Sequence, residues 1–423
     1  MENKEIIISA SDKVKKAGLG DDEHGFQYLF NNKRLEEDLT NSAKTIQEIE
    51  EEKISDILNN FIGEQFENTT ILTGAGASII NHENRELLSE YSGKTVWELT
   101  KEINDHLWEE SILNDSDLFS LEEFVEKVKY FTGDERYSVE KVNIEDLLSK
   151  AESAKEYISI NEDEKVKFDG TLYTIEEKIK ELCTLQLHKF HPHPRFLEKV
   201  TMRRSSHNRV KLFTTNYDTL FEQAAEQEGF ILVDGFTYNF PRKFNPFIYD
   251  YDFVRRGDNK VTDEPDYVEK VIHLYKLHGS IDWERRGENE IVKQEDPKHA
   301  LMIYPRRNKY EQSYEPPYFE MFSRFQLELR KKNTLFISIG FSFADKHIRT
   351  IVENAMKNNP SLRILIVDYD LQQESFKVFR DRIDNGYQNI MLFQGDFSRF
   401  ENFYLKQKAF SDQFFEDTGD KYE

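Results

Sequence analysis

The sequence predicts an α/β fold, with an open and mostly parallel sheet and helices packed on its faces. From residue 206 onward, short apolar strand candidates alternate with helical or irregular stretches, as expected for such a sheet. Polar or glycine-containing segments follow several candidates, at the carboxyl ends where parallel sheets bind ligands. The candidates are Thr70–Thr73, Val210–Thr214, Phe230–Val233, Ile272–Leu277, Leu301–Tyr304, Thr334–Ile339, Ile364–Val367 and Ile390–Phe393.

The N-terminal segment is polar and acidic. Apolar residues recur at helical spacing from Leu35 to Ile62, so we expect an acidic helical extension over residues 1–65. Residues 66–410 would form the ligand-binding α/β domain, and residues 411–423 an acidic C-terminal tail. A chain of 423 residues is long enough to be divided in this way.

Residues 95–205 are predicted to form a helical subdomain inserted into the α/β domain. Ser120–Glu123 has the spacing of a capping box, and apolar residues follow it at helical intervals. Thr174–Glu177 repeats that spacing before another apolar set, which predicts a second helix start.

Composition and charge exclude several classes of function. The formal net charge of −23 disfavours autonomous nucleic-acid binding, because a phosphate-binding surface needs an excess of Lys and Arg. The single cysteine, Cys183, excludes an intrachain disulfide or a cysteine zinc site, and its leucine neighbours indicate a buried position. No apolar run approaches the roughly 20 residues of a membrane span. The run Ile6–Ile8 is too short for a signal peptide, so we expect a soluble cytoplasmic protein.

Three nearby histidines, His188, His191 and His193, form a candidate metal cluster. Only the first two have helical spacing, and Pro192 and Pro194 interrupt a helix there. The pattern therefore predicts a polar helix end and a turn, with no metal site.

A glycine-containing loop follows the first strand candidate. Glycines allow a tight turn and close approach to a phosphate, and the N-terminus of a following helix would attract the anion. A plain strand-to-helix turn explains the loop equally well. The third glycine of a dehydrogenase loop and the lysine of an ATPase loop are missing. The loop consists of Gly74, Ala75, Gly76, Ala77 and Ser78, and Ser78 offers a hydroxyl.

Titratable or amide side chains follow the later strand candidates. Thr215, Asn216 and Asp218 come after Val210–Thr214; Asn216 suits a carboxamide, a ribose hydroxyl or a water, while Asp218 also suits a helix N-cap. His278 precedes a glycine and suits general-base chemistry, although a single histidine is more often structural. Gly340 and Ser342 follow the strand candidate Thr334–Ile339, and Asp368 follows Ile364–Val367, where it suits ribose hydroxyls.

Taken in order, these segments resemble the sirtuin family. Gly74–Ser78 resembles the family's Gly-Ala-Gly-x-Ser loop. Thr215–Asp218 resembles its Gln-Asn-x-Asp motif, with Thr215 in place of Gln. Leu277–Gly279 resembles the segment with the catalytic histidine, and Gly340–Ser342 resembles Gly-Thr-Ser. Gly395-Asp396 is similar to the late segment near adenine, and the whole resemblance spans roughly residues 70–400.

The resemblance implies a Rossmann-like, sirtuin-type sheet that binds NAD and breaks its nicotinamide–ribose bond. Asn216, His278 and Asp218 would then be the catalytic residues. The loop with Gly74, Ala75, Gly76 and Ser78 would bind pyrophosphate. The remaining nucleotide contacts implied by the family are Thr215, Gly340, Ser342, Asp368 and Asp396.

Departures from the family narrow the implied reaction. The four-cysteine zinc module of protein-deacylating sirtuins is missing, so we expect no zinc. Ile79–Arg85 does not follow the family's Ile-Pro-Asp-Phe-Arg pattern. Thr95–Leu99 and Ile303–Pro305 look more like bacterial sirtuin-like anti-phage proteins, which hydrolyse NAD, some with a HerA-type ATPase partner.

We therefore expect an NAD glycohydrolase that releases nicotinamide and ADP-ribose in bacterial anti-phage defence. Uncontrolled NAD hydrolysis would kill the cell, so we expect gating by a partner, such as a HerA-type ATPase, or by assembly into a homo-oligomer. Three alternatives stay open: an NAD-dependent protein deacylase, a non-catalytic sensor of NAD or ADP-ribose, and a nuclease subunit that works with a HerA-type ATPase.

Overall fold

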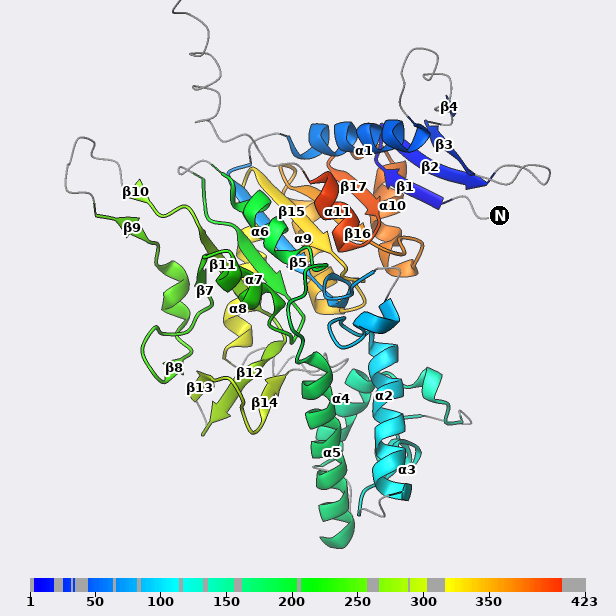
Figure 1. Ribbon diagram of the computed structural model, residues 1–423, viewed down its shortest axis with the longest axis vertical. Coiled ribbons are helices and arrows are strands. Elements are labelled where there is room, and N and C mark those ends of the chain that lie inside the picture. The colour runs from blue at the N-terminus through cyan, green and yellow to red at the C-terminus, as the bar shows by residue number, and fades with distance from the viewer. Residues whose placement is uncertain are drawn as a thin grey trace, which may run out of the picture.

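The protein is organised around one large mixed sheet (Figure 1). The computed structural model describes residues 4–18, 26–31, 33–34, 45–63, 66–81, 85–113, 117–131, 136–155, 162–203, 207–256, 266–287, 290–302 and 316–404. Within them the sheet has 11 strands in the order β4-β3-β2-β1-β17-β16-β15-β5-β6-β11-β7. The strands are β1 (Lys4–Ile8), β2 (Lys13–Gly18), β3 (Phe26–Phe30), β4 (Lys33–Arg34), β5 (Asn68–Thr73), β6 (Lys211–Thr214), β7 (Ile231–Val233), β11 (Val271–Lys276), β15 (Thr334–Ile339), β16 (Arg363–Asp368) and β17 (Ile390–Gln394).

The seven strands from β17 to β7 run parallel, which confirms the predicted α/β class. Strands β5 and β15 are buried along their whole length, because helices cover both faces of the sheet. Neighbouring side chains on a strand point to opposite faces. Phe336 accordingly packs in one hydrophobic core and Ile337 in the other.

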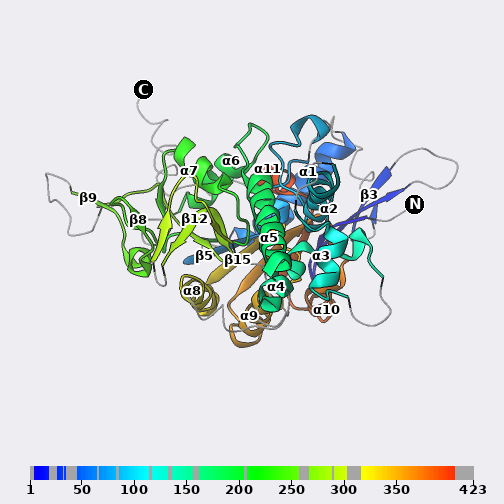
Figure 2. The ribbon, with the colours of Figure 1, turned by 90° about the horizontal axis from the view of Figure 1, so that it is seen from below.

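Two helical layers enclose this sheet (Figure 2). Apolar side chains of one layer share a core with Ile337 and Ile71, and those of the other pack around Phe336 and Leu72. The first layer contains α1 (Ile46–Ile62), α6 (His193–Thr201), α7 (Leu220–Gln227) and α11 (Phe397–Phe403). The second contains α8 (Tyr318–Arg330), α9 (Lys346–Asn358) and α10 (Lys377–Asp384). No described helix is both long and apolar enough to cross a membrane.

The N-terminal extension differs from the helical expectation. Strands β1 to β4 form an antiparallel ribbon, and β1 joins the parallel strands by pairing Ile7 with Phe393 of β17. Ile6, Ile7 and Ile8 are buried, because β-branched side chains fit a pleated surface and β1 covers the edge of β17. A helix is present only at Ile46–Ile62, started by a Thr45–Glu48 capping box; residues 35–44 lie outside the described ranges.

A helical module projects from the carboxyl edge of the sheet (Figure 1). It consists of α2 (Val96–Trp108), the π-helical turn Glu109–Leu113, α3 (Leu121–Lys127), α4 (Ile144–Ala154) and α5 (Glu162–Cys183), and it has its own hydrophobic core. The Ser120 capping box that the sequence predicts is formed. The second predicted helix start is wrong, because Thr174 lies inside α5 and its hydroxyl donates to the Gly170 carbonyl (2.9 Å). Helix α6, at the end of the predicted insertion, packs on the sheet instead.

A small antiparallel sheet lies beside the parallel one. It consists of β14 (Ala300–Met302), β12 (Gly279–Arg286), β13 (Glu290–Lys293) and β8 (Arg242–Lys243). The strand predicted at Leu301–Tyr304 therefore belongs to this second sheet, and its residues 303 and 304 lie outside the described ranges. Strands β9 (Val254–Arg255) and β10 (Asp266–Tyr267) form a separate pair.

The register of the parallel strands places their carboxyl ends in one row. Thr73 of β5 pairs with Thr214 of β6 and with Ile339 of β15. Thr214 also pairs with Lys276, and Ile339 with Val367. Residues that follow these positions on different strands consequently converge on one edge of the sheet.

Two of the loops that leave this row touch through glycine backbones. The Gly76 N–H donates to the Gly340 carbonyl (3.0 Å). Gly340 has a φ of 60°, and a Cβ there would lie 2.5 Å from the Ala77 nitrogen. The glycines therefore allow two loops to pack backbone against backbone.

We expect Gly340→Ala to destabilise the protein much more than Gly386→Ala. Both glycines have positive φ, 60° and 86°, but a Cβ at Gly386 would meet nothing within 4 Å. Left-handed backbone costs a non-glycine residue about 1–2 kcal/mol, so Gly386→Ala measures that cost alone. Urea unfolding of both variants tests this expectation, and equal losses of stability would contradict it.

Candidate functional site

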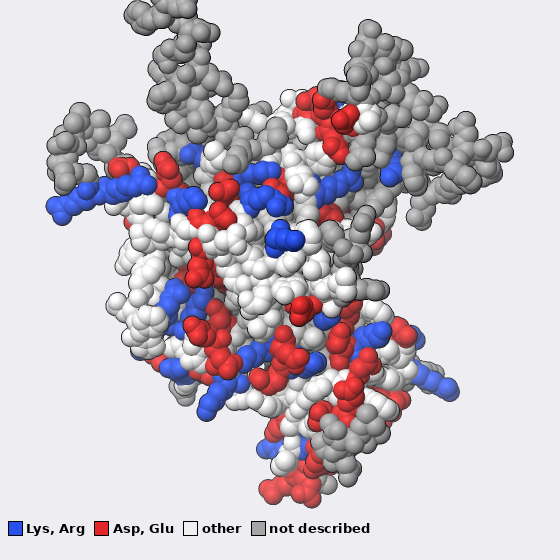
Figure 3. All heavy atoms as spheres, viewed as in Figure 1, with Lys and Arg blue, Asp and Glu red and all other residues white. Residues whose placement is uncertain are grey.

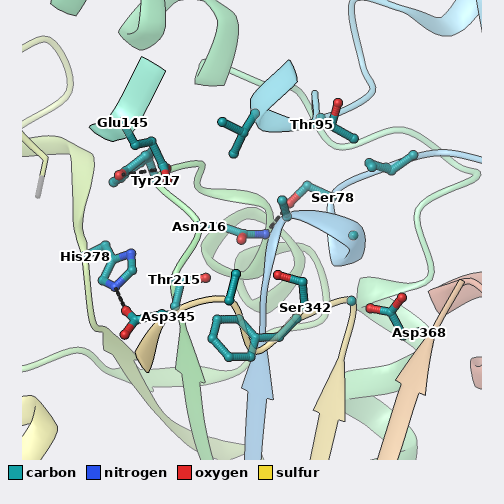
Figure 4. Close-up of a pocket in the computed structure, with 18 of the residues that line it drawn as sticks. Ser78, Thr95, Glu145, Thr215, Asn216, Tyr217, His278, Ser342, Asp345 and Asp368 are labelled. Carbon is teal, nitrogen blue, oxygen red and sulfur yellow. Dashed lines mark hydrogen bonds and ion pairs between the residues drawn. The ribbon is translucent and has the colours of Figure 1, made fainter. Parts of the chain in front are cut away.

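The carboxyl edge of the sheet and the helical module enclose a cavity of about 1600 Å³ (Figure 4). This volume exceeds the roughly 300–1,000 Å³ of ordinary small-molecule sites. All the site residues predicted from the sequence line this cavity except Gly74, which is buried and does not line it. They are Ala75, Gly76, Ser78, Thr215, Asn216, Asp218, His278, Gly340, Ser342, Asp368 and Asp396.

The glycine loop is not followed by the α-helix that the sequence led us to expect. A three-residue 3-10 turn, Ala75–Ala77, comes next, and the short 3-10 helix Arg85–Leu88 comes later. The N–H groups of the loop are engaged inside the protein: Gly74 donates to Ile339 (3.1 Å), and Ser78 donates to Ala75 (3.1 Å). The expected α-helix directly after the loop is therefore wrong, and packing against Ile339 and Gly340 uses the N–H groups of Gly74 and Gly76; the phosphate contact of the loop stays a prediction.

The hydroxyl of Ser78 joins the first two predicted segments. It donates to Asp218 Oδ2 (2.6 Å) and accepts a hydrogen bond from Asn216 Nδ2 (2.7 Å). Asn216 Nδ2 also donates to the Gly74 carbonyl (2.9 Å). Both amide protons of Asn216 are thus engaged, which leaves its Oδ1 on the side away from Ser78 (Figure 4). Ser78 uses its proton on Asp218, so it orients Asn216 instead of offering that proton to a phosphate.

Asp218 has both roles that the sequence left open: it contacts the start of a helix, and it takes part in the network around Asn216. Its Oδ1 accepts the Leu220 N–H (3.1 Å) at the start of α7, while its Oδ2 holds Ser78. It is buried, and it reaches Asn216 through the Ser78 hydroxyl. Thr215 has a backbone role as well, since its N–H donates to the Thr73 carbonyl (3.0 Å).

A buried lysine supports the loop that carries Asn216. Lys276, the last residue of β11, is 3% exposed, and its ammonium donates to the carbonyls of Tyr217 (3.3 Å) and Asp218. It also pairs with Glu222 of α7 (3.2 Å). Because this ammonium lies among fixed acceptors, it holds the backbone between Asn216 and α7 in place.

The small sheet is attached to the same region by a second buried lysine. Lys293 of β13 contacts Asp234 (3.0 Å) and Asp282 (3.3 Å). Burial lowers the pKa of Lys293, but these carboxylates and Glu222 outweigh it and raise the pKa overall, so the ammonium stays charged.

His278 contacts an aspartate that was not among the predicted site residues. Its Nε2 lies 3.4 Å from Asp345 Oδ2. Asp345 also caps α9 by accepting the N–H groups of His347 (2.7 Å) and Ile348 (3.3 Å). Burial raises the pKa of Asp345, but the hydrogen bonds from His278 and from these N–H groups lower it overall. An ionised Asp345 therefore orients the imidazole, and its place before a helix was the signal in the sequence.

The opposite side of the cavity is acidic (Figure 4). Asp368 ends β16, and burial raises the pKa of its carboxyl group to about 6. Its Oδ1 accepts the Asp370 N–H (2.9 Å). Asp396 is engaged by the Arg399 N–H (2.7 Å) and by Asn81 Nδ2 (2.7 Å). Both carboxylates keep acceptor positions for a polar ligand.

One wall of the cavity comes from the helical module. Glu145, in the first turn of α4, accepts a hydrogen bond from the Tyr217 hydroxyl (3.4 Å). Its carboxyl group lies on the same side of the cavity as His278 (Figure 4). Cys183, at the end of α5, also lines the wall, and burial raises the pKa of its thiol to about 12. Glu145 lies outside every motif that the sequence analysis considered, and no pattern in the chain marks it.

The histidines near α6 serve packing and turn geometry. His191 Nδ1 accepts the His188 N–H (2.8 Å), and His193 packs edge-on against Phe221 and Phe397. Across the described ranges, no group of three or more His, Cys, Asp or Glu side chains is arranged to hold a metal ion.

Comparison with known proteins adds a family match over part of the chain. Residues 210–382 match the model of the SIR2-like domain family. The matched segment runs from β6 to α10 and contains Asn216, His278, Asp345 and Asp368, but not the glycine loop or the helical module. No curated protein matches this chain.

Two solved structures are distantly similar. One is a crystal structure of Sir2 with the inhibitor EX-527, 2'-O-acetyl-ADP-ribose and deacetylated p53 peptide; it is 11% identical over 82% of this chain and 96% of that chain, with a TM-score of 0.33. The other is a structure on sirtuin substrate affinity, 14% identical over 84% of this chain and 98% of that chain, with a TM-score of 0.32.

We expect Asp368→Asn to stabilise the protein at pH 8 but hardly at pH 4. The folded-state pKa of about 6 lies above the ordinary aspartate value of 3.8, so the folded state binds more protons than the unfolded state between these values. Ionisation of Asp368 therefore costs the folded state more than the unfolded state, and the protein loses stability as the pH rises through 6. Asparagine has no carboxyl group to ionise, so the variant does not lose this stability. Thermal unfolding from pH 4 to 8 measures it. Asp381→Asn, on the exposed surface of α10, is the control. A gain that does not change with pH would contradict the expectation.

Proposed function

We propose that this protein cleaves the nicotinamide–ribose bond of NAD and transfers the ribose to water, releasing nicotinamide and ADP-ribose. One observation carries the proposal. In one cavity, Asn216 lies between the His278–Asp345 pair on one side and Asp368 on the other (Figure 4). The match of residues 210–382 to the SIR2-like domain supports the same reaction class.

The proposed substrate would lie along the row of strand ends. Asp368 and Ser342 would hold the adenosine ribose, and Asp396 would lie near adenine. The pyrophosphate would pass the walls formed by Ala75 and Gly76, which places the nicotinamide ribose beside Asn216 and His278. Carboxylates suit ribose hydroxyls as hydrogen-bond acceptors, which is why Asp368 is assigned to this contact.

In the proposed reaction the C1'–N bond breaks and its electron pair passes to the pyridinium ring. The ribose then carries oxocarbenium-like positive charge. Asn216 Oδ1 would position the ribose or water, because its amide protons are held by Gly74 and Ser78. His278, oriented by Asp345, would accept a proton from a ribose hydroxyl or water. Asp218 would act by holding Ser78, which in turn orients Asn216.

Water is the proposed acceptor for two reasons. The chain has one cysteine, so it cannot form the four-cysteine zinc module of protein-deacylating sirtuins. The segment after the glycine loop also departs from the pattern of that group. A deacylase and a non-catalytic sensor of NAD or ADP-ribose are the alternatives that the experiments below distinguish, and a nuclease subunit that works with a HerA-type ATPase is the third alternative.

We also propose that the activity is gated in a cytoplasmic anti-phage defence system, by a HerA-type ATPase or by homo-oligomerisation. Unrestrained hydrolysis would exhaust the NAD of the host cell. Thr95–Leu99, which resembles such proteins, starts α2 and borders the cavity. The first turn of α5 carries Glu162, Asp163 and Glu164 at the distal end of the helical module (Figure 3), a surface suited to a basic partner.

The assembled protein, or the protein with its activating partner, should release nicotinamide from NAD without any acylated peptide, whereas full activity of the isolated monomer would contradict the proposed gating. His278→Ala should lower the rate roughly 10²-fold or more, as expected for loss of a general base. Asn216→Ala should lower it as well, whereas His299→Ala, at an exposed histidine of the small-sheet region, should not. Chromatography of nicotinamide and ADP-ribose, with and without candidate partners, is the measurement.

Three other outcomes would replace this proposal. Nicotinamide release that requires an acetylated peptide would indicate a deacylase. NAD binding without turnover in every preparation would indicate a sensor. Wild-type rates for both variants would remove Asn216 and His278 from catalysis.

Asp345→Asn should separate the two roles of Asp345. Asparagine caps helices about as well as aspartate, so α9 and the melting temperature should be nearly unchanged. The amide cannot stabilise a protonated His278, so NAD turnover should fall by roughly 10-fold or more. Steady-state rates and thermal unfolding of the same preparation test this, and a parallel loss of stability and activity would speak against an orienting role.

A further inference from the structure

We propose that Glu145, which the helical module contributes, is a further catalytic residue: its carboxylate accepts the proton of the water that attacks the ribose. This role rests on the proposed NAD hydrolysis. It assigns the water to Glu145 and leaves the ribose hydroxyl to His278.

The position of Glu145 carries the inference. It lies in the first turn of α4, which Asn143 caps, and it borders the cavity. The Tyr217 hydroxyl donates to its Oε1 at 3.4 Å. Figure 4 shows Glu145 and Tyr217 on the same side of the cavity as His278, with Asn216 toward its middle. A reacting C1' beside Asn216 and His278 would therefore face the Glu145 carboxylate.

The surroundings of Glu145 raise the pKa of its carboxyl group above the ordinary value of a glutamate. Burial, the largest influence, raises its pKa, and the charge of Asp345 raises it further; His278 and the Tyr217 hydroxyl act in the opposite direction. Cys183 of α5 also faces it, and that thiol is neutral because burial raises its pKa to about 12. A base is most effective when its pKa lies near the working pH.

The other carboxylates nearby are already engaged. Asp218 is held by Ser78 and by the Leu220 N–H. Asp345 is held by His278 and by the first turn of α9. Glu145 has one hydroxyl partner at 3.4 Å, so it retains acceptor capacity toward the cavity.

The proposed step balances in atoms and charge. The oxygen of water forms a bond to C1' while the C1'–N bond breaks, and the bonding pair neutralises the positive nicotinamide ring. One proton of the water passes to Glu145 and then to solvent, and the proton that His278 accepts from the ribose hydroxyl returns to that oxygen in the product. The products are nicotinamide, ADP-ribose and a proton.

Glu145→Gln in the full chain tests the role, because glutamine keeps the shape and an oxygen for the Tyr217 hydroxyl. We expect nicotinamide release from NAD to fall roughly 10²-fold. The acidic limb of the wild-type pH profile of kcat/KM should become less steep in this variant, because His278 remains as the only proposed base. Glu152→Gln, on the same helix and paired with Lys155 (2.9 Å), is the matched control and should retain the wild-type rate and profile.

Azide provides a readout that a structural role would not change. Azide attacks C1' without losing a proton, so it does not need the base. In Glu145→Ala, added azide should restore nicotinamide release at least several-fold and give the azide of ADP-ribose, while wild type should show little acceleration.

The outcomes separate this role from the proposed function. If wild type releases no nicotinamide, with or without a partner, both fail. If wild type is active and Glu145→Gln matches it in rate and pH profile, only the Glu145 role is overturned. Failure of azide to restore Glu145→Ala, alongside an active wild type, also overturns it.

Discussion

The alignment of the parallel strand ends is the constraint on which the site depends. Thr73, Thr214 and Lys276 pair across adjacent strands, and Ile339 and Val367 continue the same row. Segments up to about three hundred residues apart therefore start their loops side by side. Any polar side chain within a few residues of this row can reach the cavity, and a shift of register on one strand would remove its side chain from the site.

Close packing turns this row into an ordered site. Gly76 and Gly340 let two loops touch through their backbones. The Ser78 hydroxyl then links Asn216 to Asp218, and buried Lys276 holds the carbonyls that follow Asn216. Each polar group is satisfied by a neighbour from another strand, so the orientation of Asn216 depends on the whole edge of the sheet. Such support is what a reacting group needs to keep one geometry.

Features that depend on a local sequence pattern could be predicted, whereas features that depend on tertiary contacts could not. The parallel strands were predictable because buried β-branched runs repeat between helical stretches. The N-terminal strands were not, since Ile6–Ile8 is a short run whose pairing partner is β17, near the other end of the chain. The glycine loop was found, but its role changed: its glycines face Gly340, which no local pattern encodes. The place of Asp345 before a helix could have marked it as a helix cap, but its contact with His278 depends on the fold.

The sequence by itself determined the α/β class, the positions of the parallel strands and the polar residues after them, because periodicity and strand-end chemistry are local properties. Only the tertiary structure decided which partners these residues have. It paired His278 with Asp345, gave the Ser78 proton to Asp218, and brought Glu145 of the helical module to the cavity. The physical reason is that hydrogen-bond partners and burial depend on residues distant in sequence, and these set both the orientation and the pKa of each group.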